Sequence, residues 1–452
     1  MTNQRDMIRL GAGSGFWGDG MDPALELLER GQLDYLCFDF LAELTMALLQ
    51  RQKQKNPQAG YIPDAVQYMK AMMPIARANG VKLISNGGGV NPRAAAEAIV
   101  ADARALGLAG TRVALVEGDD LLGKLDQMRA DGVRFRHMET GVEGFESIPG
   151  KVVSANVYTD ATGIIEGLAR GAHVVITGRV SDNAVYVGPI MHEFGWRHDA
   201  AHVDRIAAAI TLGHIVECSA ACTGGMSSRF PEMRDMGRVG FPIVEFHRDG
   251  SAEITKVPGS GGRVDAFTVK EHIVYEIADP ANYLMPDGVA DFTSFKMTET
   301  GPDRVRITGV RGKPVRDHAS FDVVAIGKTQ VLLRRDVAQH GAAEPADHGR
   351  ANAARDVVVA RCDIGRERPE RIERRLAALL QLLVHVDLDL VHRHVAGAFD
   401  HDLAALLPGD LRELAQRLEL GELRAVVGVR DRARTQAVAE RERHVVLAHQ
   451  IA

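Results

Sequence analysis

Three short segments combine glycines with carboxylate, amide or guanidinium side chains, which are groups that bind small anions and transfer protons. They are GAGSGFWGDG at residues 11–20, SNGGGVN at residues 85–91 and TGRVSD at residues 177–182. Glycines let backbone N–H groups approach an anion closely, and arginine offers a planar fork to a carboxylate or phosphate. Carboxylates serve as general acids and bases. The segments therefore predict a ligand site if the fold brings them together.

These segments follow short apolar runs that predict buried strands. The runs are Met7–Leu10, Lys82–Ser85 and Val174–Thr177, and a helical pattern follows each of them. A fourth run, Tyr35–Phe38, leads into Asp39 in the same way. Parallel strands present their carboxyl ends along one edge of an α/β sheet, and ligands bind at that edge. We therefore expect the loops to converge on one ligand, although each glycine loop taken alone also fits a tight turn.

Strand, glycine-bearing loop and helix alternate through about the first 230 residues, which predicts an α/β fold. We expect an open, doubly wound, mostly parallel sheet of the Rossmann-like kind, with a barrel as the second choice. The apolar segments on either side of Asp249-Gly250 predict a β-hairpin. We divide the chain into an α/β ligand-binding domain at residues 1–235, a smaller β-rich or α+β domain at 236–316, and a C-terminal segment at 317–452.

The C-terminal segment has an unusual composition. No methionine follows Met297, and after Asp317 the chain has nineteen arginines but one lysine, Lys328. A G+C-rich gene that is read outside its frame favours arginine codons and depletes lysine and methionine codons. We hypothesise that the chain leaves its reading frame near Arg316 and continues as a poorly ordered or irregularly helical tail. The alternative is an authentic helical domain, because RIERRLAALLQLL has helical periodicity; translation of the coding DNA in six frames distinguishes the two.

Charge and composition narrow the class of protein. The formal net charge of −6 argues against a broad nucleic-acid-binding surface. No apolar run reaches the length of a membrane span, and the first ten residues lack the core of a signal peptide. Four cysteines in 452 residues do not form a disulfide framework. We expect a cytoplasmic protein without a nucleic-acid partner or a membrane span.

The candidate site residues come from the predicted loops. Asp39, Glu43 and Asp182 are the candidate acid–base catalysts, because carboxylates at strand ends suit proton transfer. Arg179 and Asp182 also suit a simpler role, as an ion pair that only fixes its loop. The candidate ligand-binding residues are Gly11, Gly13, Gly15, Asp19, Asn86, Gly87, Gly88, Gly89, Asn91, Gly178, Arg179, Thr223 and Gly224.

Two other motifs are weaker. The first glycine segment resembles a dinucleotide fingerprint, but Phe16 stands where that fingerprint needs glycine, and the helix starts late. His214, Cys218 and Cys222 are spaced to share one helix face, so a metal site is conceivable there. Because cysteine is commonly a small buried apolar residue, we predict no metal ligands. The sequence does not identify a cofactor.

Six segments together resemble the acyclic terpene utilisation family (AtuA-like proteins). They follow the family's order from about residue 7 to residue 316, after which we find no resemblance. The segments are GAGSGFWGD, LDYLCFDFLAELTMALL, LISNGGGVNP, VITGRVSDNAVYVGP, LGHIVECSAACTGG and TKVPGSGGRVDAFTVKEHIVYEIADPANYLMPDGVADF. The resemblance implies a cytoplasmic catabolic role in the breakdown of acyclic terpenoids such as citronellol and geraniol. Those pathways handle branched acids as CoA thioesters beside acyl-CoA carboxylases. The resemblance implies no catalytic residues.

These observations lead to three hypotheses of function. The first is an enzyme that acts on an acyl-CoA or related carboxylate, with Asp39 or Asp182 as acid or base. The second is a non-catalytic binding or assembly partner of an acyl-CoA carboxylase-type complex. The third is an NAD-linked oxidoreductase. In each case we expect an anionic small-molecule ligand and a homo-oligomer.

Overall fold

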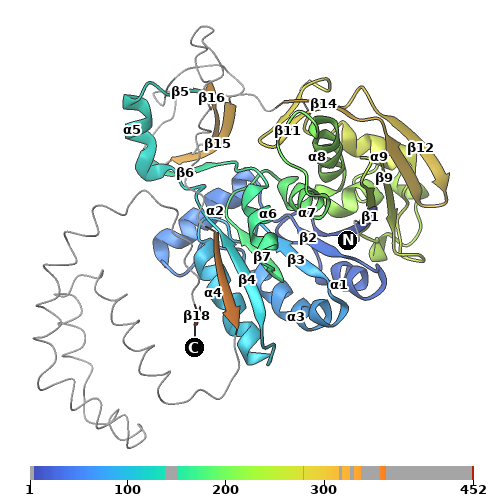
Figure 1. The fold of residues 1–452 in the computed structure, drawn as a ribbon, viewed down its shortest axis with the longest axis horizontal. Helices are drawn as coiled ribbons and strands as arrows, with labels where there is room; N and C mark the ends of the chain where they lie inside the picture. Colours follow the sequence, from blue (N-terminus) through green and yellow to red (C-terminus); the bar gives the residue numbers. More distant parts are fainter. Residues whose placement is uncertain are drawn as a thin grey trace, which may run out of the picture. The chain divides into compact units, whose positions relative to one another are not determined.

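The computed structural model describes residues 5–137, 144, 151–277 and 279–314, and the backbone of further strands at residues 318–325, 330–336, 357–362 and 450–451 (Figure 1). The fold is α/β, with a large mixed sheet and two small sheets. This confirms the predicted fold class at that level, while the finer Rossmann-like assignment and the division into domains stay predictions. The predicted poorly ordered or irregularly helical tail at residues 317–452 lies outside the described residues, apart from those strands.

Five parallel strands form the centre of the large sheet. Their order across the sheet is β1 (Met7–Ser14), β2 (Tyr35–Phe38), β3 (Lys82–Ser85), β7 (Val174–Thr177) and β4 (Thr111–Val116). Each is an apolar run of the kind predicted from the sequence. Because neighbouring strands run in the same direction, the loops that follow β2, β3 and β7 leave the same edge of the sheet.

Antiparallel strands extend the sheet beyond β1. They are β8 (Pro242–His247), β9 (Ala252–Lys256), β13 (Arg304–Thr308) and β12 (Lys296–Gly301). The hairpin predicted at Asp249-Gly250 joins β8 to β9, which confirms that element. On the other side, β4 pairs with β17 (Val357–Cys362), beside which lies β18 (Gln450–Ile451).

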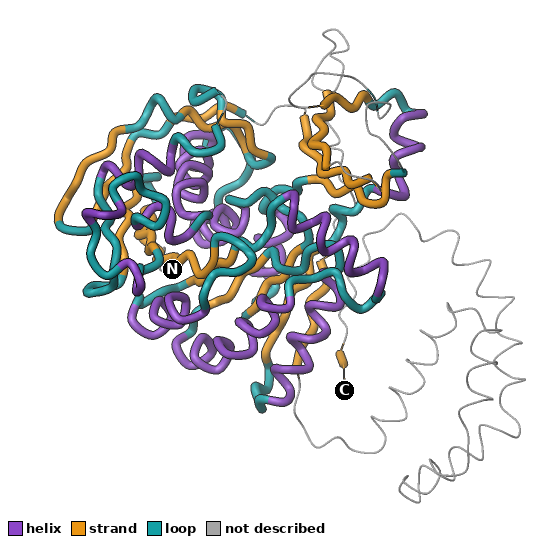
Figure 2. Tube along the Cα trace, turned by 180° about the vertical axis from the view of Figure 1, so that it is seen from behind, coloured by secondary structure: helices purple, strands orange, loops and turns teal. Residues whose placement is uncertain are grey.

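Helices cover both faces of the parallel strands (Figure 2). Leu36 and Phe38 of β2 face one apolar core, whereas Tyr35 and Cys37 of the same strand face the other. Helices α1 (Met21–Arg30), α3 (Pro63–Asn79) and α4 (Pro92–Ala105) pack on the first face, and α6 (Thr162–Ala169), α7 (Ala184–Phe194), α8 (Val203–Glu217) and α9 (Ala266–Ile273) on the second. This arrangement explains why the central strands are apolar on both sides.

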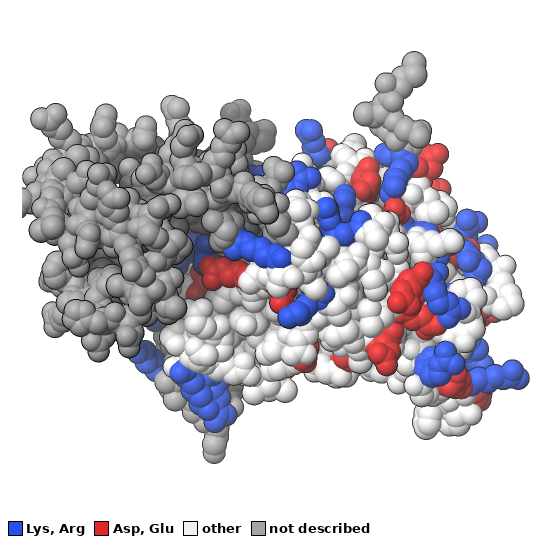
Figure 3. All heavy atoms as spheres, turned by 90° about the horizontal axis from the view of Figure 1, so that it is seen from below, with Lys and Arg blue, Asp and Glu red and all other residues white. Residues whose placement is uncertain are grey.

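Two small antiparallel sheets complete the described strands. One contains β10 (Tyr283–Met285), β11 (Gly288–Asp291) and β14 (Arg311–Lys313); the other contains β5 (Arg134–His137), β16 (Gln330–Asp336), β15 (His318–Ala325) and β6 (Val152–Val157). The remaining α-helices among the described residues are α2 (Glu43–Lys55) and α5 (Leu125–Ala130). No described helix is long and apolar enough to cross a membrane. Basic and acidic side chains of the described residues are interspersed on the face drawn in Figure 3.

Candidate functional site

Three of the predicted segments meet at the carboxyl edge of the parallel strands. Asp39 follows β2, Asn86 follows β3, and Arg179 to Asp182 follow β7. Asn86 Nδ2 donates to Asp39 Oδ1 at 2.5 Å, and Asn86 Oδ1 accepts from the N–H of Phe40 at 2.8 Å. The asparagine therefore fixes the carboxylate of Asp39. This aspartate residue is only 4% exposed.

Arg179 and Asp182 form the ion pair that the sequence suggested. Arg179 Nη1 donates to Asp182 Oδ1 at 2.6 Å and to the carbonyl of Val180 at 3.0 Å, and its guanidinium lies 3.9 Å from the ring centroid of Tyr158. The arginine side chain is fully buried, whereas 33% of the Asp182 side chain is exposed. The pair does fix its loop, but it also leaves one carboxylate open to solvent.

Tyr158 connects Glu43 to Arg179. The hydroxyl of Tyr158 donates to Glu43 Oε1 at 2.5 Å, while the ring of the same tyrosine lies against Arg179. Burial raises the pKa of Asp182, and Glu43 raises it further. All three predicted catalytic carboxylates thus belong to one electrostatic group, although their catalytic role stays a prediction.

Sequence reasoning missed Glu217 as part of this group. Glu217 ends α8, is 4% exposed, and its Oε1 lies 3.1 Å from His214 Nδ1. The hydroxyl of Tyr283 lies 3.2 Å from the same nitrogen. Within the described part of the chain, Glu217 Oε2 and His214 Nε2 have no hydrogen-bond partner. The available signal was an ionisable pair, His214 and Glu217, at the end of a helix that has no other ionisable residue after Arg205.

We call Asp39, Asp182 and Glu217 the acidic cluster. Burial raises the pKa of Asp39 well above its ordinary value, and the charges of Asp182 and Glu217 raise it further. Burial and Asp182 likewise raise the pKa of Glu217. Burial also raises the pKa of Asp182, although Arg179 opposes this effect and the solvent-exposed part of the side chain moderates it. Burial lowers the pKa of His214 to about 4, so this imidazole is neutral at pH 7.

Several amides of the glycine loops donate to acceptors within the protein. The N–H of Gly15 donates to Asp19 Oδ2 at 2.7 Å, that of Gly87 to Ser85 Oγ at 3.0 Å, and that of Gly178 to the carbonyl of Val116 at 3.2 Å. Gly89 and Gly224 also donate to backbone carbonyls. These N–H groups have acceptors within the protein, and a role of the glycine loops in binding an anion stays a prediction.

Packing accounts for the same glycines. A side chain at Gly15 would overlap the backbone of Cys218, one at Gly88 the carbonyl of Thr177, and one at Gly178 the carboxylate of Asp119. Others would meet apolar side chains, as at Gly11, Gly13, Gly87 and Gly89. Gly11 and Gly13 lie inside β1, which is longer than the predicted strand. The glycine-rich pattern therefore marks close backbone approach.

Other predicted ligand-binding side chains hold loops together. Asn91 Oδ1 accepts from the N–H of Ala94 at 3.4 Å and so caps the start of α4, and its Nδ2 donates to the carbonyls of Pro57 and Ala59. Thr223 Oγ1 donates to the carbonyl of Gly240 at 2.6 Å. These contacts give each residue a structural role, and a role in ligand binding stays a prediction.

The sequence model described as acyclic terpene utilisation family protein AtuA matches residues 8–370 of the chain. The chain belongs to the acyclic terpene utilisation family. The match confirms the resemblance of the six segments and continues past Arg316, which corrects the shorter extent that those segments had suggested. A comparison with curated proteins and another with solved structures found no match.

In this AtuA family protein, possible metal ligands gather at a different place from the one considered in the sequence. Among the described residues, Asp160, His198 and Asp287 have ligand atoms within 4.8 Å of one another. His214 instead contacts Glu217 and Tyr283. Burial raises the pKa of the Cys222 thiol to about 12, in keeping with a small buried apolar residue.

Proposed function

We propose that this AtuA family protein is an enzyme of acyclic terpenoid and branched-chain acid catabolism that transfers protons on an acyl-CoA or a related carboxylate. Family membership supports the pathway. One observation carries the chemistry: Asp39, Asp182 and Glu217 come from three separate segments of the chain. Burial raises the pKa of Asp39, and the charges of Asp182 and Glu217 raise it further. Groups whose environments shift their pKa values are the usual acids and bases of active sites.

The three carboxylates of the acidic cluster differ in their partners and in their exposure. Asp182 is paired with Arg179 and is partly exposed, so it is the carboxylate best placed to stay ionised and to meet a ligand. Asp39 and Glu217 are buried, and their raised pKa values favour the protonated form. This arrangement supplies a base at Asp182 and proton donors behind it. Arg179 is fully covered and acts as a positioning residue for Asp182.

A ligand screen on the full chain tests this proposal. We expect CoA thioesters of branched acids, or the free acids, to raise the melting temperature, because a ligand that binds only the folded state stabilises it. Mass spectrometry of the stabilising compound after incubation then detects turnover. We expect Asp182→Asn and Asp39→Asn to reduce turnover by roughly 10²–10⁴-fold while the compound still raises the melting temperature. The exposed Asp126→Asn is the matched control.

Two results would overturn the proposal. The first is a melting temperature that no thioester or free acid changes. The second is turnover that Asp39→Asn and Asp182→Asn leave at the level of the control. Copurification of a carboxylase-type subunit together with that second result would instead favour a non-catalytic assembly partner.

A further inference from the structure

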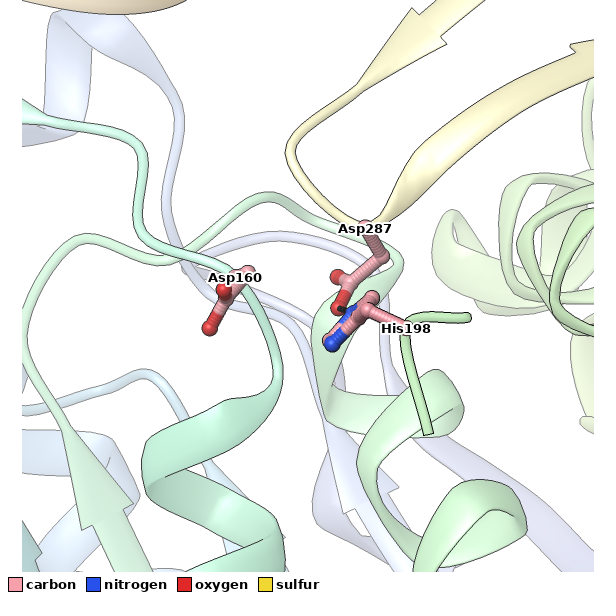
Figure 4. A group of neighbouring side chains, drawn as sticks. All are labelled: Asp160, His198 and Asp287. Carbon is pink, nitrogen blue, oxygen red and sulfur yellow. Dashed lines mark hydrogen bonds and ion pairs between the residues drawn. The ribbon is translucent and has the colours of Figure 1, made fainter. Parts of the chain in front are cut away.

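Asp160, His198 and Asp287 form a second group of ionisable side chains, apart from the acidic cluster. Asp160 precedes α6, His198 lies between α7 and α8, and Asp287 lies between β10 and β11. Figure 4 shows the three side chains on three separate segments. His198 Nε2 lies 2.8 Å from Asp287 Oδ1, and one ligand atom from each residue lies within 4.8 Å of the others.

Backbone amides orient both carboxylates. The N–H of Ala161 donates to both oxygens of Asp287, each at 3.1 Å, and the N–H of Thr162 donates to Asp160 Oδ1 at 2.8 Å. An ionised carboxylate has about four lone-pair positions, so the bonds from Ala161 to Asp287 leave room for a further ligand on that residue. Such supporting hydrogen bonds are the usual surroundings of metal-ligating carboxylates.

The group is buried, which makes its charge costly. Asp287 is 2% exposed and Asp160 is 9% exposed, while the His198 side chain is 8% exposed. Two buried carboxylates carry more negative charge than one imidazole balances. A bound cation would compensate that charge.

We propose that Asp160, His198 and Asp287 bind a divalent transition-metal ion, Zn²⁺ or Mn²⁺. An imidazole with two carboxylates is a donor set that suits these ions better than Ca²⁺ or Mg²⁺, which prefer oxygen ligands alone. Ligands of one zinc ion at 2.0–2.2 Å lie about 3–3.5 Å apart, so the observed spacing needs only a small contraction. Three protein ligands leave a position for water or substrate.

This inference goes beyond the proposed function, because the two groups use different residues. They are connected by one short segment of chain. Tyr158 of this segment contacts Arg179, the N–H of Ser181 donates to the carbonyl of Thr159 at 3.0 Å, and Asp160 belongs to the proposed metal site. Metal binding is measurable without any turnover, so either proposal can fail without the other.

The chain contains a matched control for the metal site. His202 Nδ1 lies 2.7 Å from Asp199 Oδ1, and both side chains are more exposed than those of the proposed site. The pair repeats the imidazole–carboxylate contact a few residues from His198, but it does not belong to a three-residue group of possible ligands among the described residues. A metal that simply prefers surface histidines would bind here as well.

The experiment uses the full chain without a histidine tag, treated with a chelator and then titrated with ZnCl₂, MnCl₂ or MgCl₂ by calorimetry. We expect about one equivalent of Zn²⁺ or Mn²⁺ per chain and a rise in melting temperature with that ion. His198→Gln and Asp287→Asn should weaken binding by about 10-fold or more, whereas His202→Gln should bind like the wild type. Circular dichroism establishes which variants fold, and Asp160→Asn replaces Asp287→Asn if the latter does not.

Three outcomes would overturn the metal site. They are the absence of binding by the wild type, binding that the folded site variants retain, and binding that His202→Gln abolishes. Stabilisation by Mg²⁺ but not by Zn²⁺ or Mn²⁺ would also contradict the proposed ion class.

Discussion

The acidic cluster and the Asp160 group both bury carboxylates close to one another, but they balance the charge differently. The acidic cluster has Arg179, a cation that does not lose its proton in proteins. The Asp160 group has His198, which can be neutral, charged or a metal ligand. Bound protons therefore compensate the remaining negative charge of the acidic cluster, which suits proton transfer. At the Asp160 group an exchangeable cation can compensate the remaining negative charge.

The two groups also differ in how they are held. Asp39 and Asp182 follow strands of one parallel sheet, and one of them is fixed by a side-chain amide and the other by a guanidinium. Asp160 and Asp287 are both fixed by backbone amides at the start of α6. Side-chain partners can be removed by substitution, whereas backbone partners cannot. A substitution can therefore remove a hydrogen-bond partner of Asp39 or Asp182 without changing the Asp160 group.

The largest expected effect comes from removing the cation of the acidic cluster. Arg179→Met takes the guanidinium away from Asp182 and Tyr158 and leaves buried carboxylates without it. Breaking a buried ion pair in this way costs about 3–5 kcal/mol. We expect Arg179→Met to lower the free energy of unfolding by that amount in urea denaturation.

Arg30→Met is the control for this substitution, because Arg30 pairs with Glu26 at an exposed helical position. Such pairs contribute less than about 0.5 kcal/mol. Equal stability of the two variants would show that Arg179 does not balance the acidic cluster. A stable Arg179→Met protein would thus remove the difference between the two groups.

The sequence predicted what depends on local pattern. Apolar runs such as Tyr35–Phe38 and Val174–Thr177 predicted the strands, and their alternation with helices predicted the parallel centre of the sheet. Asp39 and Asp182 could be placed at one sheet edge because parallel strands order their own ends.

The sequence could not predict contacts between distant segments. Asp160 and Asp287 are far apart in the chain, and no spacing rule brings them together. Glu217 joins the acidic cluster only because α8 packs behind the sheet. The glycines were ambiguous for a further reason: close backbone packing and anion binding both require a missing side chain. At Gly15 the backbone of Cys218 leaves no space for a side chain, so packing alone is a sufficient reason for glycine there.

An intermediate effect is expected from pH. Burial lowers the pKa of His214 to about 4, below the value of about 6.5 in the unfolded chain. As the pH falls from 6.5 to 4, the unfolded state gains a proton that the folded state does not, so stability decreases. The contribution of His214 is on the order of 3 kcal/mol. Between pH 6.5 and 4, we expect the free energy of unfolding of His214→Gln to fall less than that of the wild type, by the contribution of His214. Urea denaturation at each pH measures this difference.

Asp119 acts in the opposite direction over part of this range. Burial raises its pKa to about 6, so its contribution to stability is present at low pH and is lost as the pH rises through 6. Comparing His214→Gln with the wild type cancels this shared contribution. His202→Gln, which changes a partly exposed histidine, should follow the wild-type curve. Parallel curves for all three proteins would contradict the inference that His214 stays neutral beside the acidic cluster.

The smallest expected effect concerns the backbone contact behind the acidic cluster. Gly15→Ala places a methyl group against the backbone of Cys218, the residue after Glu217. Overpacking of this kind costs about 1–3 kcal/mol, because the two backbones must separate. Gly123→Ala is the control, since no atom lies within 4 Å of the added carbon. If thermal denaturation finds both variants equally stable, the glycine at 15 is not required for packing, and its predicted role at a ligand regains support.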